Sequence, residues 1–112
     1  MNKVICIGRL VSDPELRKTV NGEYFSGFTL AVNRIKSDKA DFIDCICYKK
    51  NAENLCQYIK KGDLISIVGS IRTRIKNERK STEIKVDEIT FLNCKGKENL
   101  TDNFTGDIKV PE

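Results

Sequence analysis

The feature of this sequence that most constrains its fold is the segment 41–74, which has the pattern of a strand, a helix and a second strand in direct succession. Residues 41–48 alternate with the period of two that a strand requires. One face of this strand is apolar and compact, as a core requires, and holds Ile43, Cys45 and Cys47. The expected helix, 51–61, also has one apolar side, which consists of Ala52, Leu55, Cys56 and Ile59. This helix is therefore expected to pack against the sheet.

The rest of the chain adds further strands. The patterns predict strands over 4–10, 24–33 and 82–92, besides 41–48 and 64–74. Gly8 interrupts the first strand, where we expect a bend or a bulge. The order is three strands, one helix and two strands. It fits a mostly β fold, a five-stranded Greek-key barrel with one α-helix between strands three and four, known as the OB-fold.

The charge divides the chain into a body and a tail. From residue 96 onward apolar residues are isolated, so we expect one folded domain over 1–95 and a flexible, disordered tail over 96–112. The tail holds two lysines and four acids, a net charge of −2, whereas the whole chain carries +4. The body therefore carries +6. A basic body indicates a polyanionic partner.

The cysteines indicate core thiols and no cofactor or metal. The chain has five, and only Cys45 and Cys47 form a close pair, without the second pair that a zinc site needs.

The sequence predicts a cytoplasmic protein without a membrane span. Its thiols are expected to be reduced, it lacks the layout of a signal peptide, and it has no apolar run of about 20 residues. The chain has no histidine, P-loop or nucleophile motif, which favours a binding protein over an enzyme.

The face of strand 41–48 opposite the core carries two aromatic rings, Phe42 and Tyr48. Cations border this face: Lys49, Lys50, Arg72 and Arg74. Rings on a sheet face that is flanked by cations form a surface on which bases stack while phosphates are held.

Specific phrases support the same interpretation. The segments concerned are NKVICIGRLVSDPELR, NG, FTLAVNR, ADFIDCICYKKNAEN, YIKKGDLISIVGSIRTR and EIKVDEITFL, within about residues 1–94. Over this range the chain resembles bacterial single-stranded DNA-binding proteins of the homotetrameric type, most specifically in GRL-x-x-DPELR, KKG and G-x-x-RTR. The resemblance implies an OB-fold, a homotetramer and no catalysis. It also implies wrapping of single-stranded DNA in replication, recombination and repair, near the nucleoid.

The same resemblance suggests site residues. It implies that Phe42 and Tyr48 stack bases, at about 1–3 kcal/mol for each stacked base. It places phosphate contacts at four cations: Lys50, Lys61, Arg72 and Arg74. Four further cations are weaker DNA-binding candidates: Arg17, Lys36, Lys49 and Lys76.

The chain departs from the family in two regions. Where the family carries two more rings, this chain reads Ile35-Lys36 and Ile75-Lys76. We hypothesise that it stacks fewer bases and depends more on cations, so that its affinity falls more steeply with salt. The family also implies that replication and repair proteins bind the tail, but this chain ends GDIKVPE without the family's final Pro-Phe pair.

Two alternatives remain open at this point. The first is a dimeric OB-fold accessory protein of replication restart that acts mainly through protein partners, and the oligomer mass distinguishes it. The second is an RNA-binding OB domain, which competition between matched RNA and DNA strands distinguishes.

Overall fold

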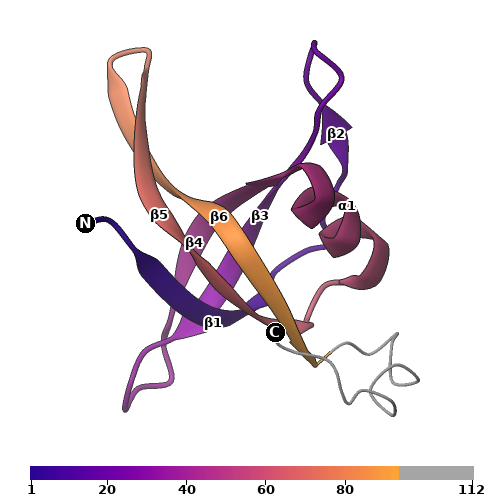
Figure 1. Ribbon diagram of the computed structural model, residues 1–112. Helices are drawn as coiled ribbons and strands as arrows, with labels where there is room; N and C mark the ends of the chain where they lie inside the picture. The colour runs from indigo at the N-terminus through magenta and orange to yellow at the C-terminus, as the bar shows by residue number, and fades with distance from the viewer. Residues whose placement is uncertain (94–112) are drawn as a thin grey trace.

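The computed structural model describes residues 1–93, which are mostly β, as predicted. Its elements are β1 (Val4–Leu10), β2 (Arg17–Lys18), β3 (Tyr24–Asn33), β4 (Ala40–Tyr48), α1 (Lys49–Tyr58), β5 (Leu64–Lys76) and β6 (Arg79–Asn93). Two hairpins and the β3–β4 loop extend from the body as separate arms (Figure 1). The predicted tail, 96–112, lies outside the described residues.

The sheet closes on itself. Its strand order is β1-β5-β6-β4-β3-β2, and β1 also pairs with β3. The β4–β6 pair is parallel, and the other pairs are antiparallel. The five long strands therefore form a barrel with α1 between its third and fourth strands, which confirms the predicted OB-fold. The two-residue β2 is an addition at the margin of β3.

Closure takes place along β1, which pairs with two strands. Residues 4–9 pair with β5, whereas Arg9 and Leu10 pair with Ala31 and Leu30 of β3. A Cβ atom at Gly8 would lie 2.6 Å from the carbonyl oxygen of Ala31. The backbone of β3 thus passes so close to Gly8 that a side chain there would clash with it.

The start of the chain is tied to β5 by one side chain. The Asn2 Oδ1 accepts a hydrogen bond from the backbone N–H of Ile71, and its Nδ2 donates to the carbonyl of the same residue, both at 2.8 Å. The side chain amide thus imitates a backbone pair and continues the β1–β5 ladder beyond Val4.

The helix differs from its predicted bounds, 51–61. It begins earlier, at Lys49, because Asn51 does not cap it and instead donates from Nδ2 to the carbonyl of Asp87 at 3.1 Å. It ends earlier because Ile59 is extended and the Lys60 N–H donates to the Asp63 carboxylate at 2.8 Å. The residues after Tyr58 therefore form a turn into β5.

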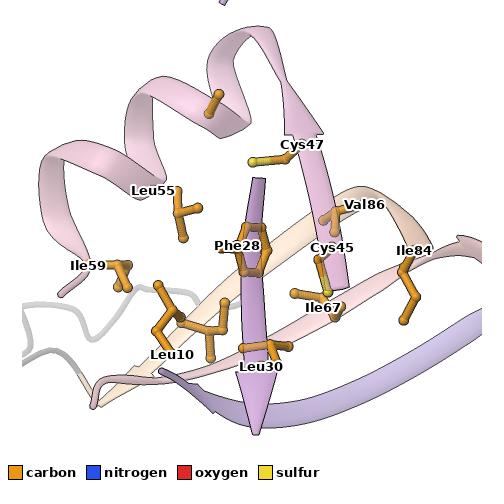
Figure 2. Packing of buried hydrophobic residues seen from close by; sticks show 12 residues of the cluster. Leu10, Phe28, Leu30, Cys45, Cys47, Leu55, Ile59, Ile67, Ile84 and Val86 are labelled. Carbon is orange, nitrogen blue, oxygen red and sulfur yellow. The ribbon is translucent and has the colours of Figure 1, made fainter. Parts of the chain in front are cut away.

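The core lies between α1 and the inside of the barrel. Figure 2 shows Leu55 of α1, and Ile59 directly after it, directed toward Phe28 and Leu10. The predicted helix face is confirmed, since Ala52, Leu55 and Ile59 are fully buried and Cys56 is half-buried.

The inner face of β4 is confirmed by its cysteines. Cys45 and Cys47 are buried in the core, and this burial raises the pKa of each thiol to about 12. Such thiols stay protonated and inert at neutral pH. Cys94 lies outside the described residues.

Within residues 1–93, no cluster of His, Cys, Asp and Glu suits a metal ion, and no helix could span a membrane.

The β5–β6 hairpin is longer than predicted. Its ladder continues to the pair Lys76 and Arg79, so only Asn77 and Glu78 form the tip, with φ values of 53° and 64°. A β-bulge precedes Ile89 on β6. Val68 pairs with Glu88 and Gly69 with Val86, which leaves an extra residue on β6.

We predict that Gly69→Ala strongly destabilises the barrel. A Cβ atom at this position would overlap the backbone carbonyl of Lys85 on β6, and backbone atoms cannot move aside as a flexible side chain can. The free energy of unfolding, measured in urea, should fall by about 1–3 kcal/mol or more.

Gly27→Ala on β3 is the matched control. Its Cβ atom would meet only the carbonyl oxygen of Cys45, at an ordinary 3.8 Å. Its change in unfolding free energy should stay within about 1 kcal/mol. Equal losses in the two variants would contradict the assignment of a close approach at Gly69.

Candidate nucleic-acid interface

The outer face of β4 presents an open aromatic ring. Phe42 is 68% exposed, whereas Cys45 and Cys47 on the opposite face of β4 are buried. Within residues 1–93, no ring or cation is stacked on Phe42. An apolar ring with a free face can accept a nucleotide base without rearrangement of its neighbours.

Tyr48 lies on the same face of β4 but is already packed. Its ring centroid is 6.4 Å from that of Phe25, and the two planes are tilted by 36°. Arg72 Nη2 donates to the Tyr48 hydroxyl oxygen at 3.3 Å, and the guanidinium carbon lies 5.8 Å from the ring centroid. The two predicted stacking rings are therefore unequal, since a base at Tyr48 has to share the ring with Arg72.

The arginines of β5 are gathered around one carboxylate. Arg72 and Arg74 are two residues apart on β5 and share its outer face, and Glu83 lies opposite Arg72 on β6. Arg74 Nε donates to Glu83 Oε2 at 3.0 Å, and Arg72 Nε is 4.0 Å from the same oxygen. The cluster of these three residues carries a net charge of +1.

The lysines after Tyr48 begin α1. Lys49 has φ of 56° and its Nζ is 3.8 Å from Glu23, and Lys50 follows it on the first turn. Together with Tyr48 and Lys85 they line a cleft of about 410 Å³. Cations therefore flank the Tyr48 end of β4 as well as the β5 side.

Arg17 belongs to the same face through strand pairing. It pairs with Phe25, which in turn pairs with Tyr48, and residues directly opposite one another in antiparallel strands share a face. Its guanidinium contacts Glu15 at 3.0 Å, and both side chains are largely exposed. An exposed pair of this kind contributes little stability and leaves the cation accessible to phosphate.

Two of the predicted cations, Lys61 and Lys36, lie apart from Arg72 and Arg74. Lys61 precedes β5, with its backbone N–H bonded to Asp13 Oδ1 at 2.7 Å, and Arg72 lies near the other end of that strand, about 25 Å away along it. Lys36 is in the β3–β4 loop. Lys76 is the last residue of β5, two residues after Arg74 on the same face of the strand and next to the hairpin tip. Figure 1 shows this loop and this hairpin as different arms.

The β3–β4 loop and the β5–β6 hairpin each carry an exposed isoleucine. Ile35 is 88% exposed and Ile75 is 79% exposed. The base of the loop is fixed by Arg34, which donates twice to Asp41 Oδ1, at 2.8 and 3.1 Å. This contact holds the pKa of Asp41 below its ordinary value. Both isoleucines can contact a base edge, but neither offers a π-face.

Sequence reasoning missed Phe25 and Glu83. Phe25 has the same strand parity as Thr29 and Ala31, so the alternation along β3 could have placed it on the outer face. Nothing local marks Glu83, because its partners Arg72 and Arg74 come from the neighbouring strand.

Comparison with known proteins gives a consistent match. The model of the "Single-strand binding protein family" matches residues 1–92. The chain belongs to this family. A single-stranded DNA-binding protein of Halalkalibacterium halodurans is 40% identical over 120 residues, covering 95% of this chain and 71% of that protein. Single-stranded DNA-binding protein A of Bacillus subtilis is 38% identical, covering 85% of this chain and 61% of that protein. A single-stranded DNA-binding protein of Clostridium perfringens is 44% identical, covering 82% and 66%.

Membership in the single-strand binding protein family confirms the resemblance found in the sequence. The matched range includes β1 to β5, α1 and all of β6 except its last residue, and therefore Phe42, Tyr48, Arg72 and Arg74. These matches do not favour the replication-restart accessory protein or the RNA-binding domain.

We predict that Phe42→Ala weakens binding of single-stranded DNA by about 1–3 kcal/mol and leaves the fold intact. The ring is mostly exposed, so its loss removes a stacking platform and little core packing. Fluorescence anisotropy with labelled oligo-dT measures the affinity, and thermal unfolding measures the stability.

Tyr58→Leu serves as the control for loss of a ring. Tyr58 ends α1 and packs against Phe91 with centroids 6.3 Å apart, away from the outer face of β4. This variant should bind as the wild type does. A Phe42→Ala variant with wild-type affinity would show that this ring does not stack bases.

Proposed function

We propose that this chain binds single-stranded DNA with little sequence preference, and so protects and wraps it in replication, recombination and repair. The observation that carries the proposal is the exposed ring of Phe42 on a sheet face that also presents Arg72 and Arg74. The names of the relatives support the same ligand.

The chemistry of binding follows from this face. The arginines and the lysines at the start of α1 hold the phosphates, while Phe42 stacks a base through a π-face that every base possesses. Tyr48 contributes a second ring once Arg72 has turned toward a phosphate. Double-stranded DNA should bind weakly, because its bases are already stacked on one another and cannot reach the ring.

The test is an anisotropy titration of labelled oligo-dT and of a matched duplex over a series of salt concentrations. We expect a strong preference for the single strand. The logarithm of the binding constant should fall by about 0.7 per phosphate contact for each tenfold rise in salt. Because Ile35 and Ile75 replace rings of the family, this slope should be steeper than that of a ring-rich relative. Equal affinity for the two DNAs would refute the proposal.

We also propose that four copies assemble through β1. Ile5 and Ile7 are 67% and 54% exposed on its outer face. Among residues 1–93, the strand pairs with β5 alone over residues 4–8, so its other edge has no ladder partner there. Exposed apolar side chains on a partly unpaired strand favour contact with another copy. A homotetramer agrees with the family, and a dimer is the alternative.

We predict that Ile7→Glu disrupts this assembly. A charge on the apolar face of β1 would have to be buried against the second copy. Light scattering coupled to size exclusion should give four times the chain mass of 12.7 kDa for the wild type and a smaller mass for the variant. Val20→Glu is the control, since Val20 is fully exposed at the β2–β3 turn. A wild type of 12.7 kDa would exclude a tetramer.

We further propose that the chain acts by binding and not by catalysis, in the cytoplasm near the nucleoid. The absence of histidine from the sequence and the match to a DNA-binding family support a binding role. Replication and repair proteins are the proposed protein partners, through residues 96–112, whose net charge is −2. This segment lies outside the described residues.

A further inference from the structure

One acidic side chain lies within the proposed cationic surface. Glu83 is directly opposite Arg72 on β6, and its Oε2 atom is 3.0 Å from Arg74 Nε and 4.0 Å from Arg72 Nε. A single carboxylate oxygen therefore faces two guanidinium groups, the same two groups that the proposed function assigns to DNA phosphates.

This carboxylate satisfies only one of the two arginines. Arg74 Nε makes the hydrogen bond, whereas Arg72 Nε is buried and has no hydrogen-bond acceptor among the described residues. A buried donor without an acceptor is unfavourable. Arg72 instead donates through Nη2 to the hydroxyl of Tyr48. The guanidinium of Arg72 thus contacts Tyr48 and lies beside Glu83, to which its Nε makes no hydrogen bond.

The carboxylate is also less exposed than its partners. The Glu83 side chain is 20% exposed, against 40% for Arg72 and 53% for Arg74. The arginines therefore present more surface to solvent than the acid between them. Solvent and salt screen a partly buried charge less than a fully exposed one, so the field of Glu83 persists at the surface where a phosphate would bind.

We propose that Glu83 competes with the DNA backbone for Arg72 and Arg74 and thereby limits the affinity for single-stranded DNA. This inference rests on the proposed function. In the free protein Glu83 orders Arg74 and neutralises half of the charge of the arginine pair. In the complex the same carboxylate repels the bound phosphate. Glu83 thus positions the arginines and weakens their hold on DNA.

The sign of the effect distinguishes this role from a purely structural one. Glu83→Gln keeps the size of the side chain and removes its charge, so binding should become tighter. One unit charge several ångströms from a phosphate at a protein surface corresponds to about two- to fivefold in affinity. With both arginines free to hold phosphate, the salt slope should steepen by about 0.7. Loss of a merely structural contact would weaken binding instead.

The experiment compares wild type and Glu83→Gln by anisotropy with labelled oligo-dT across a salt series. Glu88→Gln is the matched control, because Glu88 is an exposed acid of β6 beyond the bulge and its loss changes the net charge equally. Glu88→Gln should change the affinity less than Glu83→Gln does, and it should leave the salt dependence of the binding constant unchanged. Glu83→Asp keeps the charge and should bind as the wild type does.

Each result decides the proposal. Tighter binding and a steeper slope for Glu83→Gln alone support it. Unchanged or weaker binding by this variant, or an equal gain in Glu88→Gln, overturns it and leaves the proposed function standing. Failure of the wild type to bind oligo-dT overturns both. Should Glu83→Gln not fold, as judged by circular dichroism, Glu83→Thr removes the charge with a residue that suits a strand, and the same outcomes apply.

Discussion

The position of β6 between β4 and β5 is the constraint on which the rest of this structure depends. It pairs antiparallel with β5 along its length and parallel with β4 at Ile84 and Lys85. The rings of β4 and the arginines of β5 come to the same side of the sheet because β6 pairs with both strands. The close backbone approach at Gly69 and the adjacent bulge allow β6 to serve both partners. The strand pairings of β6 therefore determine both the barrel and the geometry of the proposed binding face.

The outer face combines strong cations with few free rings. Phe42 is open, Tyr48 is engaged by Phe25 and Arg72, and the arms carry isoleucine at 35 and 75. Stacking depends weakly on salt, whereas phosphate contacts depend on it strongly. We therefore expect its affinity for DNA to depend on salt more steeply than that of a surface rich in aromatic residues. The effect proposed for Glu83 would act on this electrostatic part of binding.

Local patterns predicted the fold well, and its long-range contacts less well. Alternation in a strand does not depend on its neighbours, so the inward Cys45 and the outward Phe42 could be assigned from sequence. The start of α1 could not, because the amide of Asn51 binds the carbonyl of Asp87, 36 residues away. The packing of Tyr48 and the contacts of Glu83 with Arg72 and Arg74 likewise depend on which strands pair, and local sequence patterns do not show this. The phosphate contact that family resemblance implies for Lys61 stays a prediction; in the structure this residue precedes β5, whereas Arg72 and Arg74 lie in its second half.

The pairing of Asn2 with Ile71 has a consequence for the hairpin. Two hydrogen bonds of 2.8 Å connect the second residue of the chain to a strand position 69 residues later, immediately before Arg72. Asn2 thus fixes β5 at the residue before Arg72, where the β5–β6 hairpin leaves the barrel. The place of the arginine-bearing strand therefore depends in part on hydrogen bonds from a residue near the start of the sequence.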